Sequence, residues 1–140
     1  MKLAHMFDSV LINLHEKFRY LSHMTNQPIK ILDVGWGNKS PSLTERFFPC
    51  SEYHGIDREI YNLTEYDLRI MDKFYNKDLN EDDLSDIPDE YFDYVVVCHV
   101  LQHTYDPCSL LEQLTREVKS GGYIIRVFFL TKYVWHSPLL

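Results

Sequence analysis

Residues 29–40, Ile-Lys-Ile-Leu-Asp-Val-Gly-Trp-Gly-Asn-Lys-Ser, constrain the fold more than any other stretch of the chain. The run from Ile29 to Val34 is short and mostly apolar, which is typical of a strand buried on both faces. Gly35 and Gly37 follow directly, and glycine lets a backbone approach a ligand more closely than any other residue does. The stretch therefore predicts a strand that ends in a tight, ligand-accessible turn.

A helix is expected to begin directly after this turn. Ser40 is a favoured N-cap, and Pro41 then takes the first helical position. Amides at a helix N-terminus point outward, and the helix dipole favours negative groups. Strand, turn and helix start together predict a nucleotide-binding corner, although a glycine turn by itself also occurs as a simple tight turn.

Acidic residues follow the next two expected strands. Tyr53 to Asp57 predicts a short strand whose terminal carboxylate can accept from both hydroxyls of a ribose. The alternative for Asp57 is a solvated aspartate in a turn. Lys73 to Asn76 predicts a polar edge strand, and Asp78 follows it as a candidate partner for an adenine amino group. The remaining acids up to Glu90 are expected to form a solvated loop.

The clearest strand is Phe92 to Val97, and two histidines follow it. In open α/β sheets, ligands bind outside the carboxyl ends of the strands, so His99 and His103 are candidate site residues. They would share one face of a helix, if the segment is helical. Without a third ligand they do not predict a zinc site, so no metal is expected.

The remaining elements complete an alternating pattern. Residues 2–24 carry an apolar stripe at helical spacing, which predicts a helix that packs on the sheet or covers the ligand as a lid. Asp106-Pro107 starts another helix, and Ser120-Gly121-Gly122 is expected to end it. Residues 123–130 predict a fifth strand. Alternating strands and helices predict an α/β fold with a doubly wound, mostly parallel sheet.

Composition restricts the class of protein further. With 140 residues, 45% of them apolar, the chain predicts one domain: an N-terminal helix in 1–25, a core in 29–130 and a tail in 131–140. No apolar run is long enough to span a membrane, and the N-terminus lacks a signal-peptide pattern, so a cytoplasmic location is expected. The formal charge of −7 argues against nucleic acid as the main partner.

Four blocks of the sequence resemble the class I S-adenosylmethionine-dependent methyltransferases, especially the type 11/12 methyltransferase-domain group. Ile-Leu-Asp-Val-Gly-Trp-Gly-Asn is similar to their first motif, and His-Gly-Ile-Asp to their acidic second-strand tip. Phe-Asp-Tyr-Val-Val-Val-Cys-His-Val-Leu-Gln-His resembles their fourth-strand block. Leu-Thr-Arg-Glu-Val-Lys-Ser-Gly-Gly resembles the turn before their fifth strand. The resemblance covers about residues 29–128.

The resemblance implies a role for each matching residue. Asp33, Gly35, Trp36 and Gly37 would bind the methionine end of S-adenosyl-L-methionine, with Asp33 toward its ammonium group. Asp57 would hold the ribose, whereas Asp78 and Leu79 would flank the adenine. His99 would sit beside the sulfonium, and His99 or His103 would be the catalytic base if the acceptor must lose a proton. The acceptor is expected to be a small molecule.

Three departures from the family pattern limit this reading. Lys39 stands where the motif usually has a third glycine, and Gln102 where a glutamate usually precedes the second histidine. The chain is also expected to lack the strand 6/7 hairpin of the family. The fifth strand would then expose an apolar edge, which predicts a homodimer or a protein partner there.

Two other functions stay open at this stage. A nicotinamide-dependent oxidoreductase would also use a glycine corner and a strand-tip acid, but Gly-Trp-Gly-Asn-Lys-Ser lacks the last glycine of that fingerprint. A non-catalytic methyltransferase-like subunit or fragment would act through a protein partner instead. Binding of S-adenosylhomocysteine separates an active enzyme from such a subunit.

Overall fold

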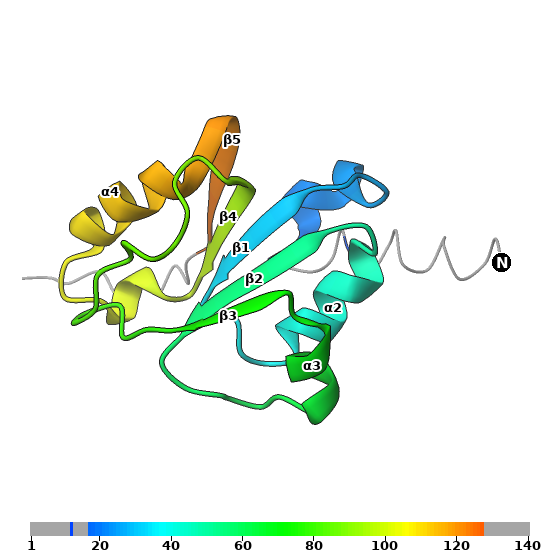
Figure 1. Ribbon diagram of the computed structural model, residues 1–140, viewed down its shortest axis with the longest axis horizontal. Coiled ribbons are helices and arrows are strands. Elements are labelled where there is room, and N and C mark those ends of the chain that lie inside the picture. The colour runs from blue at the N-terminus through cyan, green and yellow to red at the C-terminus, as the bar shows by residue number, and fades with distance from the viewer. Residues whose placement is uncertain (1–11, 13–16, 128–140) are drawn as a thin grey trace, which may run out of the picture.

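The computed structural model describes residue 12 and residues 17–127. Their centre is one sheet of five parallel strands in the order β3-β2-β1-β4-β5 (Figure 1). The strands are β1 Lys30–Val34, β2 Glu52–Asp57, β3 Lys73–Asn76, β4 Phe92–Cys98 and β5 Val118–Val127. The helices are η1 Arg19–Met24, α2 Ser40–Phe47, α3 Glu65–Ile70, η2 Leu101–His103 and α4 Pro107–Glu117. The doubly wound α/β fold predicted from the sequence is confirmed.

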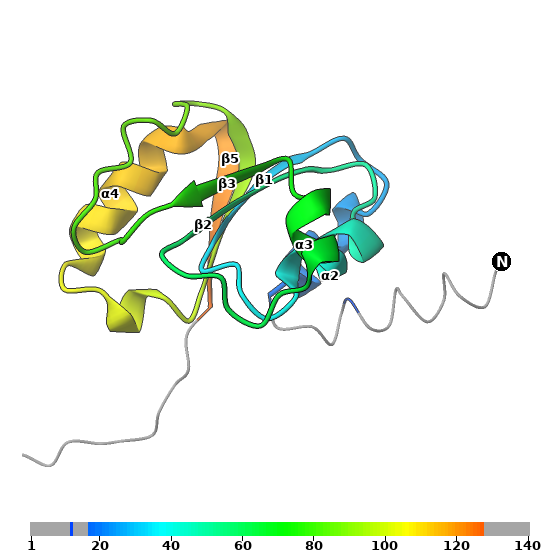
Figure 2. The same cartoon turned by 60° about the horizontal axis from the view of Figure 1, so that its bottom comes forward.

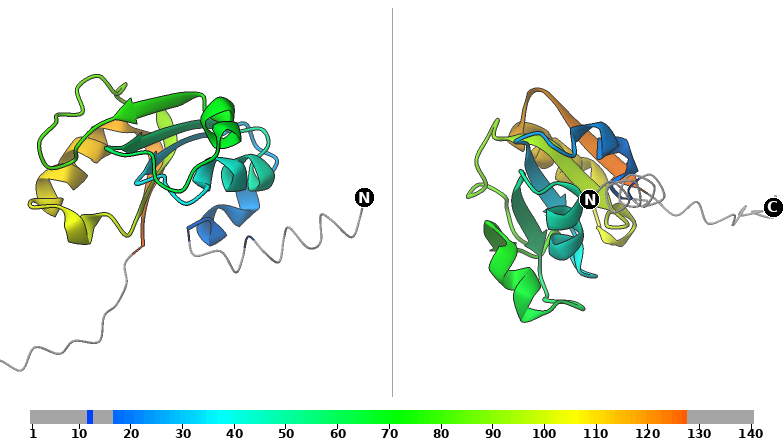
Figure 3. Two further views of the ribbon diagram at one scale, coloured as in Figure 1. Left: turned by 90° about the horizontal axis from the view of Figure 1, so that it is seen from below. Right: turned by 90° about the vertical axis from the view of Figure 1, so that its right-hand side faces the viewer.

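Alternate residues of the central strands form two apolar layers, one on each face of the sheet. Leu32 of β1 and Val95 of β4 pack with Leu110 and Leu114 of α4. On the other face, Ile31 packs with residues of η1 and α2. The turned views show α4 on one side of the sheet, and η1 and α2 together on the other (Figures 2 and 3). A strand buried on both faces needs apolar residues at successive positions, which is why β1 and β4 are mostly apolar.

The start of α2 differs from the expected boundary, whereas the start of α4 agrees with it. Ser40 is the first residue of α2 rather than its N-cap; Lys39 holds the cap position in the left-handed conformation, and its side chain makes no capping hydrogen bond. In the first turn, the Asp67 carboxylate accepts from the Ser42 amide at 3.1 Å. The Ser40 hydroxyl instead accepts a hydrogen bond from Lys17. By contrast, Asp106 caps α4 as predicted, since its side chain accepts from the Ser109 amide.

The fifth strand begins earlier than predicted. It follows α4 directly at Val118, so Ser120-Gly121-Gly122 lies inside the strand instead of ending the helix. The pairing with β4 is irregular between Phe92 and Tyr94, and Gly121 has a φ of +81° there. A Cβ on Gly122 would lie 2.8 Å from the Asp93 carbonyl oxygen. These glycines therefore allow the irregular start of β5 rather than a turn.

The expected N-terminal helix lies mostly outside the described residues. Within its described end, Arg19–Met24 forms the 3₁₀ helix η1 instead of an α-helix. Phe18 and Leu21 are nevertheless fully buried, as expected for a segment that packs on the sheet. Residues 128–140, including the end of the expected fifth strand, also lie outside the description. Among the described residues, no helix is long and apolar enough to cross a membrane.

Candidate functional site

A cavity of about 280 Å³ lies where several strands end at the carboxyl edge of the sheet. Segments that follow β1, β2, β3 and β4 all contribute to it. Its lining residues are Gly35, Asp57, Arg58, Lys77, Asp78, Leu79, Asn80, His99, Val100, His103 and Thr104. Carboxyl ends of parallel strands are where ligands bind in open α/β sheets, so this cavity is the candidate site.

Asp57 ends β2 at the cavity wall. One carboxylate oxygen, Oδ1, accepts from the Arg58 amide at 2.8 Å and from the Glu59 amide at 3.4 Å. The other oxygen, Oδ2, makes no hydrogen bond within the described part of the chain. The turn therefore fixes the carboxylate while one oxygen stays open to a ligand donor.

The loop after β3 and the segment after β4 are joined across the cavity. Asp78 accepts from the Asn80 amide at 2.9 Å, and its second oxygen lies 3.8 Å from Nη1 of Arg58. The Asn80 side chain accepts from the Tyr105 amide at 2.7 Å and donates to the His103 carbonyl at 3.5 Å. Asn80 thus ties the two walls together, so their side chains hold a defined spacing.

Both predicted histidines line this cavity, but they are not paired on one α-helix. His99 directly follows β4 with a φ of +56°, and its amide donates to the Val127 carbonyl at 2.9 Å. His103 ends η2, a 3₁₀ helix of only three residues, and is exposed. Left-handed backbone at a non-glycine residue is uncommon and often marks a functional position. No group of three or more His, Cys, Asp or Glu side chains among the described residues could hold a metal ion.

The first motif reaches the cavity only in part. Gly35 lines it with a φ of +77°, and its amide donates to the Ile56 carbonyl at 2.9 Å. Gly37 does not line the cavity. It packs against Tyr61 instead: a Cβ on Gly37 would lie 3.2 Å from the Tyr61 carbonyl oxygen. The Trp36 ring is fully buried in the core, 4.8 Å from the Phe74 ring. Trp36 as a whole is 0% exposed and does not line the cavity.

Asp33 lies beneath the corner and does not line the cavity. Its carboxylate is fully buried and receives the Tyr53 hydroxyl at 2.6 Å and the Lys17 ammonium at 2.5 Å, both on Oδ2. Burial raises the pKa of this carboxyl above its ordinary value, although the Lys17 charge and the hydrogen bonds oppose that rise. The resemblance implied a contact between Asp33 and a ligand ammonium; the structure places its carboxylate outside the cavity lining.

Five lining residues were not singled out from the sequence: Arg58, Lys77, Asn80, Val100 and Thr104. Arg58 and Lys77 adjoin the predicted acids Asp57 and Asp78, so their position in the chain was a usable signal. Asn80 carried no local signal, because its role depends on a contact with a loop more than twenty positions away. Such long-range pairing is visible only in the tertiary structure.

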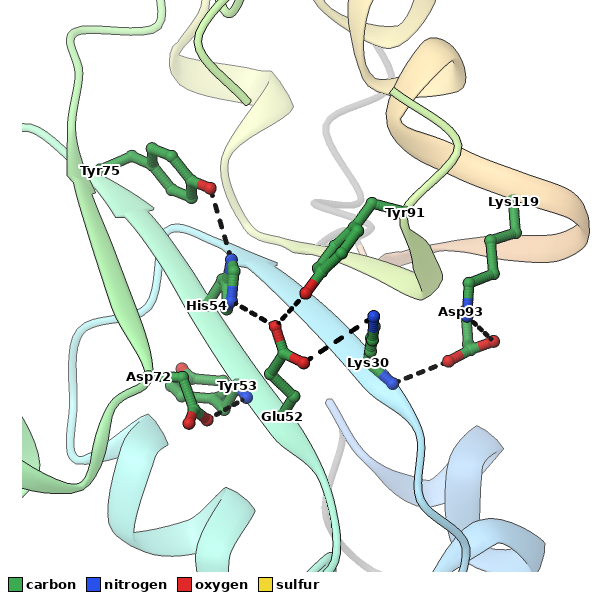
Figure 4. A network of polar contacts seen from close by, with 9 residues as sticks. All are labelled: Lys30, Glu52, Tyr53, His54, Asp72, Tyr75, Tyr91, Asp93 and Lys119. Atoms are coloured by element: carbon green, nitrogen blue, oxygen red, sulfur yellow. Dashed lines mark hydrogen bonds and ion pairs between the residues drawn. The ribbon is translucent and has the colours of Figure 1, made fainter. Parts of the chain in front are cut away.

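The opposite, amino-terminal edge of the sheet carries a separate polar network (Figure 4). Glu52 accepts from the Tyr91 hydroxyl at 2.5 Å and pairs with His54 at 2.9 Å. Asp93 accepts from the Lys30 amide at 2.8 Å and from Lys119 at 3.0 Å. These contacts join β1, β2, β4 and β5, so they stabilise the sheet at the edge opposite the cavity.

A doubly wound parallel sheet with an acidic second-strand tip beside a glycine corner is the arrangement typical of nucleotide-binding α/β folds. The profile of the methyltransferase domain family matches residues 32–126, more than half of the chain. The chain therefore belongs to the methyltransferase domain family.

Solved structures of low sequence identity share the fold. A TehB-like SAM-dependent methyltransferase from Corynebacterium glutamicum is 18% identical with a TM-score of 0.61, over 93% of this chain and 74% of that one. Coclaurine N-methyltransferase bound to N-methylheliamine and SAH is 14% identical with a TM-score of 0.60, over 85% of this chain.

A third structure with this fold is a complex between the Haloferax volcanii Trm112 methyltransferase activator and a methyltransferase. It is 18% identical with a TM-score of 0.58, over 86% of this chain and 56% of that one. This chain spans only 34% of the length of the coclaurine enzyme. No curated protein matches the chain significantly.

Proposed function

We propose that the protein binds S-adenosyl-L-methionine at this cavity and transfers its methyl group to a small-molecule acceptor. The observation that carries the proposal is the convergence of Gly35, Asp57, Asp78 and His99, from four different strand ends, on one cavity. The family match supports the same cofactor. A cytoplasmic location stays a prediction from the sequence.

The residues present fit this cofactor. The open oxygen of Asp57 suits a ribose hydroxyl. Leu79 offers the adenine an apolar contact, and the Asp78 carboxylate offers its amino group a hydrogen-bond acceptor. The cavity volume of about 280 Å³ lies just below the usual range for small-molecule sites, which begins at about 300 Å³. When bound, S-adenosyl-L-methionine supplies a methyl group on a sulfonium that is already activated for transfer.

The chain's own residues then have mostly binding and orienting roles. Asp57 and Asp78 would fix the nucleoside, while Gly35 lets the ligand lie against backbone. His99 and His103 face the same cavity and can accept a proton, if the acceptor must lose one before transfer. If it need not, the two histidines bind and orient.

Calorimetric titration with S-adenosylhomocysteine tests the proposal directly. We expect saturable binding with one site per chain, since the product and the cofactor share the nucleoside and amino-acid portions. Absence of binding by the folded chain would contradict the proposal. A methyl-transfer screen with labelled cofactor, with and without candidate partners, then identifies the acceptor.

We expect Asp57→Ala to weaken S-adenosylhomocysteine binding by roughly 1.5–3 kcal/mol, the range for hydrogen bonds to a charged group. Asp57→Asn should lose a similar amount while it keeps an oxygen for the Arg58 amide. Asp83→Ala is the control, because Asp83 is exposed and does not line the cavity. Equal affinity of all three variants and the natural chain would place the ligand elsewhere.

We also propose that the outer edge of β5 associates with a second copy of the chain. In the described sheet β5 has a neighbour on one side only, and Tyr123 on it is 63% exposed. Edge strands expose unpaired backbone groups, and a two-fold dimer is the simplest closed arrangement that covers them. A heterologous partner is the alternative, as in the complex with the Haloferax volcanii Trm112 methyltransferase activator.

We expect light scattering at micromolar concentration to show a dimer, and Tyr123→Lys to shift it toward monomer, because charge on an edge strand opposes pairing. Tyr105→Lys is the matched control, since Tyr105 is 84% exposed and lies outside β5. A natural chain that stays monomeric without a partner would contradict the homodimer.

A further inference from the structure

A buried cluster of charges lies beneath the glycine corner. The Lys17 ammonium is 2.5 Å from Oδ2 of Asp33, and the two side chains are 7% and 0% exposed. The same ammonium donates to the Ser40 hydroxyl at 2.8 Å, and the Tyr53 hydroxyl donates to Asp33 at 2.6 Å. The cluster joins four separate segments: the chain before η1, then β1, β2 and the start of α2.

These contacts surround the segment that carries the corner. Asp33 lies two residues before Gly35, and Ser40 starts the helix that follows the turn. Lys17 balances the charge of Asp33 at Oδ2, whereas Oδ1 is buried and has no hydrogen-bond partner among the described residues. None of the four side chains lines the cavity. A second ammonium at Asp33 would have to enter a closed site and meet the repulsion of Lys17.

We propose that Asp33 is a positioning residue: paired with Lys17, it holds the glycine corner in place, and it does not receive the amino group of the ligand. The inference rests on the proposed function and replaces the direct contact implied by the resemblance. Removing either charge leaves the other buried and unpaired, which displaces the segments that the cluster joins. The corner then binds every part of the ligand less well.

Two ligands separate positioning from direct contact. S-adenosylhomocysteine carries the amino acid, whereas 5′-methylthioadenosine has the same nucleoside and thioether without it. We expect Asp33→Asn and Lys17→Met to weaken both ligands by a similar factor, at least about fivefold. The ratio of the two affinities should stay within about twofold of that of the natural chain.

A selective loss of S-adenosylhomocysteine in Asp33→Asn, with 5′-methylthioadenosine unchanged, would overturn the inference in favour of direct contact. Unchanged affinity for both ligands would overturn it as well. If the natural chain binds neither ligand, the proposed function itself fails, which is a different outcome.

Folding controls accompany the titrations. The double variant Lys17→Met with Asp33→Asn removes both charges together, so its thermal midpoint should lie above that of Lys17→Met alone. Lys39→Met removes an exposed cation beside the same corner and should change neither affinity. If Lys17→Met does not fold, the ratio of the affinities for S-adenosylhomocysteine and 5′-methylthioadenosine is measured on Asp33→Asn and on the double variant. A double variant no more stable than Lys17→Met would show that the pair is not coupled.

Discussion

Replacing Gly35 with valine is expected to destabilise the fold and to weaken ligand binding at least as much as Asp57→Ala does. A Cβ at this position would lie 2.3 Å from Cγ2 of Val100, closer than two carbon atoms can approach. The φ of +77° adds strain, since side chains avoid the left-handed region and β-branched ones most of all. Strain and overpacking together predict a loss of roughly 2–5 kcal/mol in the free energy of unfolding.

Urea unfolding of Gly35→Val and Gly35→Ala measures this loss. Repeating Gly35→Ala in a Val100→Ala variant separates the steric clash from the backbone strain. In Val100→Ala the clash is relieved while the φ of Gly35 stays, so Gly35→Ala should cost less there than in the natural chain. Gly37→Ala is the milder comparison, because Gly37 has no positive φ and its nearest neighbour would be at 3.2 Å. A Gly35→Val chain of unchanged stability and affinity would show that the corner conformation is not needed.

Glu117 is expected to make the fold less stable as pH rises through neutrality. The side chain is fully buried at the end of α4, and neither carboxylate oxygen has a hydrogen-bond partner among the described residues. Burial raises its pKa from 4.5 to about 8; the Arg116 charge opposes the rise, and Asp89 and Asp86 add to it. Between pH 4.5 and about 8 the folded state holds a proton that the unfolded state has released, so stability falls as pH rises.

Across that interval the expected loss is about 3–5 kcal/mol from this one group. Glu117→Gln cannot ionise, so its free energy of unfolding should fall less steeply from about pH 5 to about pH 8.5. The control is Glu112→Gln, an exposed residue on the same helix, which should follow the natural chain. Parallel stability curves for Glu117→Gln and the natural chain would mean that Glu117 is ionised and solvated.

Much of the site was predictable from local pattern. A mostly apolar run followed by Gly35, and a short strand that ends in Asp57, each depend on neighbours in sequence. Parallel strands bring their carboxyl ends to one edge, so the order of the blocks implied that Asp57, Asp78 and His99 would meet. The cavity contains all three, with Leu79 and His103.

Other parts of the site depended on pairings that no local pattern encodes. Trp36 sits between two glycines, yet its ring enters the core because Gly55 on β2 leaves room for it: a Cβ there would lie 2.8 Å from the indole. Asn80 joins the cavity walls through contacts with His103 and Tyr105. A residue's neighbours across the sheet are set by topology, which sequence spacing does not state.

Three features could be read from local sequence pattern: the alternation of strands and helices, the position of the glycine corner and the acids at the strand tips. These follow from hydrophobic periodicity and backbone preference, which act over a few residues. Two other features depend on long-range contacts: Asp33 pairs with Lys17 and does not line the cavity, and Ser40 accepts from the same lysine rather than capping α2. A buried charge takes whichever partner the fold brings within reach, because burial without one is costly, and that partner can come from any part of the chain.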